Sequence, residues 1–157
     1  MLTSSLSASD RVVLDTHIWV WASGESGGPA QFTPDVVGPI EAAARARQLF
    51  VSATSVWEIA LKEQRGRGLV RGDLSSWVRD QRQYPGVRVM GIDSRLAIAA
   101  TRLPLWVRKR DGQEHRDPSD RFIVAKARRL NGVLITCDEE ILDYADQGHL
   151  RGYDARP

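Results

Sequence analysis

Cysteine and long apolar runs are nearly missing from this chain of 157 residues. Cys137 is the only cysteine, so an internal disulfide is impossible. No apolar stretch approaches the length that spans a bilayer. The first ten residues are small and polar, and they lack the basic start and apolar stretch of a secretory signal. We therefore expect a cytoplasmic protein without a membrane partner.

The remaining composition is that of an ordinary globular protein, with 42% hydrophobic and 27% charged residues. The length fits a single domain over 1–157, with its core at about 11–145. A chain of this size buries roughly two-thirds of its unfolded surface. Neither an internal repeat nor a clear linker divides it.

Short apolar runs alternate with segments of helical spacing along the chain. Strands are predicted over 11–15, 49–52, 87–92 and 133–136. Helices are predicted over 17–22, 54–64, 75–84, 95–102 and 119–130, with a short one after Asp138. A further helical run to about Gln48 begins either at Pro34, after a Thr33 cap, or at Pro39, since Gly38 and Pro39 interrupt the run. The stretch 24–33, rich in Gly and Ser, and the basic stretch 104–116 are expected to be loops. This alternation predicts a three-layer α/β/α fold around a parallel sheet of four or five strands.

Four acidic residues occupy places that such a fold brings to one rim. Asp15 ends the first strand and Asp138 follows the fourth. Glu58 lies in the first turns of the helix after the second strand, and Asp120 lies in the first turn of the helix that Pro118 opens. Ligands of open α/β sheets bind beyond the carboxyl ends of the strands. The four carboxylates are therefore expected to line one site.

Each acid also has a purely structural explanation when taken alone. Asp15 is a typical cap for the next helix, and Glu58 has Lys62 four residues on as an ion-pair partner. Asp120 near a helix start is favourable with the helix dipole, and Asp138 can start a helix in the same way. Four like charges on one rim repel each other and raise each other's pKa. These four carboxylates therefore predict a bound cation that offsets their repulsion.

Magnesium is the expected cation, with manganese as the alternative. Mg²⁺ takes oxygen ligands and keeps several waters, so a few carboxylates are enough. The three histidines, His17, His115 and His149, lack the ligand spacing of a zinc site. Metal ions held in this way activate water and stabilise charge on a phosphodiester during hydrolysis.

The charge balance agrees with a polyanionic substrate. The chain has 22 Lys and Arg against 20 Asp and Glu, a formal charge of +2. With four carboxylates pooled in one site, 16 acids face those 22 bases and the rest of the molecule carries +6. A basic surface around an acidic pocket suits nucleic acid. Lysine occurs only three times, and a general preference for arginine explains the counts equally well.

Four segments together resemble the PIN-domain family, and more closely the VapC-type ribonuclease toxins of bacterial toxin–antitoxin pairs. They are VLDTHIW at 13–19, SVWEIALK at 55–62, HRDPSDRFIVA at 115–125 and LITCD at 134–138. The resemblance runs in matching order from about Val12 to Asp143. It implies a magnesium- or manganese-dependent endoribonuclease in which Asp15, Glu58, Asp120 and Asp138 match the family's acids.

The resemblance also implies partners and leaves alternatives open. An RNA substrate, a cognate antitoxin and a homodimer are expected. A non-toxin RNA-processing nuclease and an inactive module that only binds RNA or protein remain possible. Asp117 matches a second acid common in this branch, for which we favour a helix cap over a metal ligand.

Further residues are candidates for contacts around the site. Thr16 and Thr136 are expected to position a ligand or a water. His115 is expected to pack or to form a hydrogen bond, with contact to a phosphate as the alternative. Arg65 and Arg67 are candidates for the RNA path, and Arg116 belongs to a basic segment that is either an RNA-contacting loop or a solvated turn. A patch formed by three tryptophans is a candidate surface for an antitoxin or a dimer mate: Trp19, Trp57 and Trp77.

Overall fold

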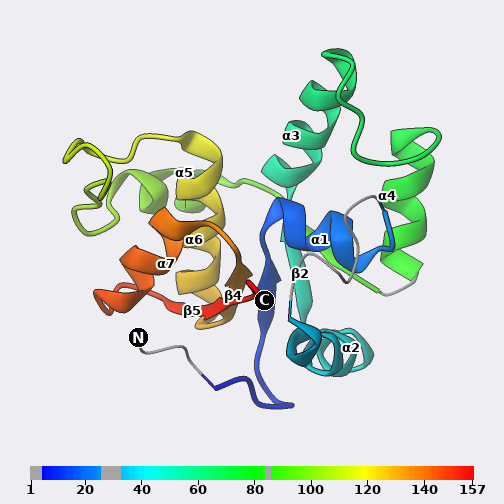
Figure 1. Cartoon of the computed structure of the whole chain (residues 1–157), viewed down its shortest axis with the longest axis horizontal. Coiled ribbons are helices and arrows are strands. Elements are labelled where there is room, and N and C mark those ends of the chain that lie inside the picture. The colour runs from blue at the N-terminus through cyan, green and yellow to red at the C-terminus, as the bar shows by residue number, and fades with distance from the viewer. Residues whose placement is uncertain (1–4, 26–32, 84–85) are drawn as a thin grey trace.

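Five parallel strands form one sheet in the order β3-β2-β1-β4-β5 (Figure 1). The computed structural model describes residues 5–25, 33–83 and 86–157, so most of the expected loop 24–33 and the expected helix end at 84 lie outside it. The strands are β1 (Val12–Leu14), β2 (Leu49–Ser52), β3 (Arg88–Met90), β4 (Val133–Thr136) and β5 (Arg151–Asp154).

Helices cover both faces of this sheet, which confirms the predicted three-layer fold. Figure 1 views the sheet nearly edge-on, with α5, α6 and α7 on one side and α1, α2 and α4 on the other. The helices are α1 (Thr16–Ala22), α2 (Val37–Arg45), α3 (Ala53–Gln64), α4 (Leu74–Gln83), α5 (Ser94–Thr101), α6 (Pro118–Leu130) and α7 (Glu139–Asp146), with a 3₁₀ turn, η2, at Pro34–Val36. Among the described residues, no helix is long and apolar enough to cross a membrane.

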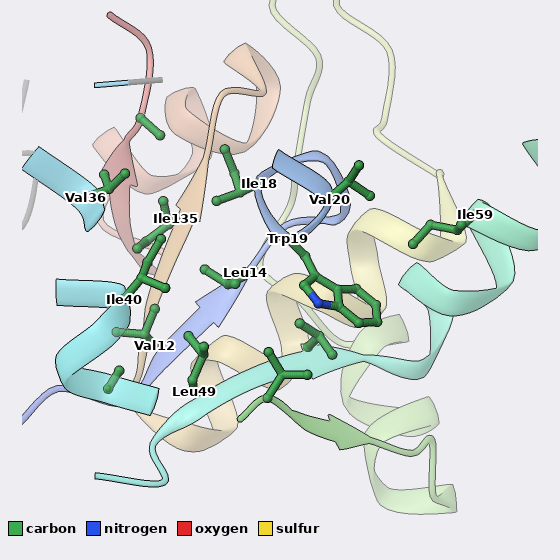
Figure 2. Close-up of a cluster of buried hydrophobic side chains, with 14 of the residues drawn as sticks. Val12, Leu14, Ile18, Trp19, Val20, Val36, Ile40, Leu49, Ile59 and Ile135 are labelled. Carbon is green, nitrogen blue, oxygen red and sulfur yellow. The ribbon is translucent and has the colours of Figure 1, made fainter. Parts of the chain in front are cut away.

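Alternating side chains of the buried strands separate two hydrophobic cores. In β1, Val12 and Leu14 face the core under α1 to α4, while Val13 faces the core under α6 and α7. Figure 2 shows the first of these cores, in which Trp19 and Ile18 of α1 lie over the strands. Because both faces are covered, β1, β2 and β4 are apolar along almost their whole length.

The first residue of α2 differs from the later of its two predicted starts. The predicted Thr33 cap followed by Pro34 is confirmed, since Thr33 caps the 3₁₀ turn η2. The alternative start at Pro39 is wrong, because α2 begins at Val37 and follows directly on that turn. Gly38 and Pro39 fall in the first turn of α2, where backbone N–H groups have no partner within the helix. Proline therefore does not interrupt the helix there.

A fifth strand, β5, lies beyond the predicted core. Arg151–Asp154 pairs with β4 along its whole length, and Ala155 after it is buried. This strand was not predicted, because RGYD is short and half polar, as suits a strand at the edge of a sheet.

The expected tryptophan patch is wrong for two of its three members. Trp19 and Trp77 are buried, with ring centroids 4.7 Å apart, and Nε1 of Trp19 donates to Oε1 of Gln81 at 3.3 Å. Trp57 alone is exposed, at 58%. Trp19 and Trp77 therefore contribute to the core and not to a partner surface.

Candidate active site

Asp15 lies where the two central strands end together. Leu14 of β1 pairs with Ile135 of β4, so Asp15 and Thr136 follow at the same carboxyl edge. Oδ1 of Asp15 accepts the backbone N–H of Thr16 at 2.7 Å, and Oδ2 accepts the Thr136 hydroxyl at 2.6 Å. The Thr136 hydroxyl oxygen in turn accepts the backbone N–H of Asp138 at 3.0 Å.

The surroundings of Asp15 favour its neutral form in the metal-free chain. Burial, with smaller contributions from the charges of Asp120 and Asp138, raises the pKa of Asp15 to about 7 against the two hydrogen bonds that Asp15 accepts. The structure therefore brings three carboxylates close enough to repel one another, without an arginine or lysine among the groups that shift this pKa.

Asp120 is held at the start of α6 by two contacts. Its backbone N–H donates to Oδ1 of Asp117 at 3.1 Å, and its Oδ2 lies 2.8 Å from Nε2 of His115. Burial raises the pKa of Asp120, the hydrogen bond with His115 opposes this, and the charges of Asp117 and Asp138 add to it. Asp120 and Asp15 are thus carboxyls from distant parts of the chain that share one electrostatic environment.

Glu58 joins the site through α6. The hydroxyl of Ser119 donates a hydrogen bond to Oε1 of Glu58. Lys62 is the expected ion-pair partner of Glu58, but its Nζ lies instead 3.1 Å from Nε2 of His17. Within the described part of the chain Glu58 forms no ion pair, so its carboxylate faces the residue next to Asp120 and not a solvated lysine.

Asp138 and Asp117 both cap helices. Oδ1 of Asp138 accepts the backbone N–H groups of Glu140 and Ile141, at 2.8 and 3.1 Å. Asp117 caps α6 through the same Oδ1 that accepts from Asp120, as the sequence suggested. Oδ2 of Asp138 has no hydrogen-bond partner among the residues that the structure describes, which leaves this oxygen for another ligand.

The residues expected around the site lie in very different surroundings. Thr16 is buried and donates its hydroxyl to Ser55 at 2.8 Å, which ties α1 to α3. Arg65 and Arg67 are exposed just beyond the end of α3, which extends away from the sheet (Figure 1). Arg116 is exposed and pairs with Glu114 at 3.1 Å. Contacts of these residues with a substrate stay predictions.

The basic stretch before α6 has more structure than a loop. Val107 and Glu114 form an isolated antiparallel bridge. The turn between them is held against α7 by a hydrogen bond and an ion pair. Lys109 makes both contacts with α7, through its backbone N–H to Glu140 at 3.0 Å and through Nζ to Asp143 at 3.2 Å. We call residues 107–114 the basic hairpin. It ends directly before His115.

The donor set fits a hydrated divalent cation better than a tightly enclosed one. Across 5–25, 33–83 and 86–157, no three His, Cys, Asp or Glu side chains form a ready-made metal cluster. The carboxylates instead converge, repel each other and keep oxygens without partners, as at Asp138. Mg²⁺ binds through one or two carboxylates and several waters, so these residues fit it.

Sequence reasoning missed two hydroxyl groups of the site, those of Ser55 and Ser119. Ser55 lies three residues before Glu58 on the same face of α3, a spacing that was visible in the sequence. Ser119 precedes Asp120, and nothing local indicated that its side chain turns toward α3.

The family model that matches this chain is the PIN domain, over residues 12–147. The chain belongs to the PIN-domain family. PIN domains are generally nucleases, and PIN nucleases generally use divalent metals. Two solved structures share the PIN fold of this chain, FitAB bound to an IR36 DNA fragment and FitAcB from Neisseria gonorrhoeae.

The likeness to these structures covers nearly the whole PIN domain. FitAB has 19% identity and a TM-score of 0.50, covering 91% of this chain and 94% of that one. FitAcB has 17% identity and a TM-score of 0.53, covering 91% and 96%. At these identities the likeness shows the fold. No curated protein matches the chain.

Proposed function

We propose that this PIN-domain protein is a divalent-metal-dependent endoribonuclease that uses Mg²⁺ or Mn²⁺. The observation that carries the proposal is the convergence of Asp15, Asp120 and Asp138 at the carboxyl edge, with the first two pKa values raised by burial and by neighbouring carboxylates. Such repulsion costs stability unless a cation offsets it, and perturbed carboxyl groups gather at functional sites.

Asp15, Asp120, Asp138 and Glu58 would hold the metal, and Asp117 would support Asp120 as a helix cap. A bound divalent ion supplies an activated water and stabilises charge on the phosphodiester. The chain's own contribution is orientation. Thr136 holds Asp15 and also receives the N–H of Asp138, so one hydroxyl links two of the acids.

RNA is the substrate we propose, because the motif resemblance implies it and exposed arginines around the site can meet phosphates. Arg65 and Arg67 are exposed just beyond the C-terminal end of α3, the helix that carries Glu58. Arg116 is exposed one residue before Asp117. Arginine at such positions adds affinity that is independent of base sequence and weakens with salt.

We further propose that the nuclease is the toxin of a toxin–antitoxin pair and forms a homodimer. The support is the motif resemblance to VapC-type toxins, together with the fold shared with FitAB, a complex bound to DNA. Trp57 is 58% exposed and directly precedes Glu58 in the sequence. It therefore offers an apolar contact for an antitoxin segment near the site.

A cleavage assay with a matched variant tests the nuclease. The purified chain is expected to cut an end-labelled RNA with Mg²⁺ or Mn²⁺, to lose activity with a chelator, and to lose it in D15N. A D15N protein that cuts at the wild-type rate with added metal overturns the proposal. Tight RNA binding without cleavage across several divalent metals supports the inactive module instead.

Expression in a bacterial host separates a toxin from a housekeeping nuclease. Induction of the wild-type chain is expected to arrest growth, and D15N is expected not to. Mapping the ends of the cut RNA would then identify the target. Normal growth despite cleavage in vitro favours the RNA-processing nuclease, and a short neighbouring gene for a DNA-binding protein favours the toxin.

A further inference from the structure

His115 is a buried histidine that the proposed reaction leaves without a defined role. Its side chain is 6% exposed, and its Nε2 lies 2.8 Å from Oδ2 of Asp120. Its other ring nitrogen, Nδ1, is the one fully buried side-chain polar atom without a hydrogen-bond partner in the described part of the chain.

The carboxylate oxygen that faces Nε2, together with the missing partner at Nδ1, decides which ring nitrogen donates. An N–H group at Nδ1 would be buried and unsatisfied, which costs about 1–3 kcal/mol. The proton therefore belongs on Nε2, where it is donated to Oδ2 of Asp120. The ring then donates one hydrogen bond, from Nε2 toward a single carboxylate oxygen.

Three stacked rings fix the plane of this donor. The His115 ring lies 4.0 Å from the Trp106 ring with 20° between their planes, and Trp106 stacks on Tyr144 at 4.5 Å. Tyr144 donates its hydroxyl to the carbonyl of Pro104 at 2.7 Å, and Trp106 donates Nε1 to the carbonyl of Glu140 at 3.3 Å. The backbone N–H of His115 also donates to the carbonyl of Trp106 at 2.7 Å. The ring therefore has little freedom to rotate away from Asp120.

We propose that His115 is a positioning residue that holds the Asp120 carboxylate in its metal-binding orientation and does not bind phosphate. With Oδ2 held by His115, Oδ1 of Asp120 is the oxygen left for the metal. The burial of the ring within the stack leaves almost no surface for a substrate phosphate. The proposal rests on the proposed metal site, and removing a residue that orients a metal ligand typically lowers metal affinity or activity 10–100-fold.

Three substitutions separate the hydrogen bond from the stacking. H115F keeps an aromatic ring on Trp106 and removes the donor. H115Q places an amide N–H as many bonds from Cα as Nε2 of histidine, and H115N places it one bond shorter. The affinity for Mn²⁺ is measured by calorimetry without RNA, and the melting temperature checks that each variant folds.

The wild-type chain and H115Q are expected to bind Mn²⁺ within about threefold of each other. H115F and H115N are expected to bind it about tenfold or more weakly, in the range for lost metal-orienting contacts. With saturating metal, H115F is expected to lower kcat for RNA with KM within about twofold.

Two results overturn the proposal: H115F with wild-type Mn²⁺ affinity, or H115F with a raised KM and unchanged kcat, which would assign His115 to phosphate binding. The calorimetry does not depend on catalysis. Weakened Mn²⁺ binding in H115F would support the positioning role even if no RNA were cleaved, and absence of Mn²⁺ binding in the wild-type chain would overturn the metal site together with it.

Discussion

The Ser119 hydroxyl donates its hydrogen bond to Glu58, and this single contact ties the first turn of α6 to the middle of α3. Ser119 is 5% exposed, so the bond forms away from bulk water. Hydrogen bonds to charged groups contribute about 1.5–3 kcal/mol. Glu58 therefore belongs to the site through a contact that orients it, and not only through its sequence motif.

Substitution of Ser119 by alanine is expected to release Glu58 and to lower kcat/KM for RNA cleavage about tenfold. The loss follows from the free energy of one hydrogen bond to a carboxylate. Steady-state kinetics at saturating Mg²⁺ measure it. The exposed serine of α4 provides the control, because among the described residues the Ser75 hydroxyl forms no hydrogen bond with any of the acids, and S75A should cut at the wild-type rate. Equal activity of S119A and S75A would show that Glu58 needs no partner.

Replacement of Asp15 by asparagine is expected to abolish cleavage and yet to stabilise the metal-free fold. The pKa of Asp15 is about 7 in the folded chain, well above the ordinary 3.8, so the folded state keeps a proton that the unfolded chain releases between these values. The free energy of unfolding of the wild-type protein therefore falls as pH rises from about 4 to 7. D15N removes this loss, with a gain of up to about 4 kcal/mol above pH 7 that vanishes near pH 4.

Urea unfolding of both proteins at pH 4.5 and pH 8, in a chelator, measures this difference. D146N serves as the control, because Asp146 is exposed at the end of α7. A D15N protein that is less stable than the wild type at pH 8 would mean that the hydrogen bonds from Thr16 and Thr136 outweigh the burial of the charge.

Two substitutions of Asp117 distinguish a helix cap from a metal ligand. D117N keeps an oxygen that accepts the N–H of Asp120, so the metal affinity is expected to stay within about threefold of the wild type. D117A removes the cap and is expected to cost about 1 kcal/mol of stability. Calorimetry with Mn²⁺ and thermal unfolding measure the two effects. A tenfold loss of metal affinity in D117N would make Asp117 a ligand.

Neutralising Arg65 and Arg67 together is expected to raise KM for RNA without changing kcat. Each phosphate contact to single-stranded RNA contributes about 0.7 to the slope of log affinity against log salt. R65Q/R67Q is therefore expected to lower this slope by about 1.4 in filter-binding titrations between 50 and 200 mM salt. If R65Q/R67Q leaves the slope unchanged, these two arginines do not contact the RNA.

The sequence predicted most of this fold because its central strands are apolar along their length and each is followed by an amphipathic helix. The acids at the ends of strands and starts of helices followed from that alternation and from the family motifs. β5 was not predicted, because half of its residues are polar. A strand that pairs with a neighbour on only one side needs no apolar run.

The contacts inside the site were less predictable, because they depend on side chains from different elements. Lys62 stands four residues after Glu58 and has the spacing of an ion pair, yet tertiary packing brings His17 to Lys62 and Ser119 to Glu58. Packing was one of the roles predicted for His115, but its partner was not predictable, since only the basic hairpin and the ring of Trp106 place it beside Asp120.

The hydrogen bond from Thr136 to Asp15 joins residues 121 positions apart in the chain. β1 is the first strand to be synthesised and lies at the centre of the sheet, and one of its two neighbours is β4, made near the end. Contacts of such large sequence separation form late in folding. A growing chain that has not yet delivered β4 therefore lacks the edge at which Asp15 and Asp138 lie, so the proposed site is assembled only after residues 133–138 have left the ribosome.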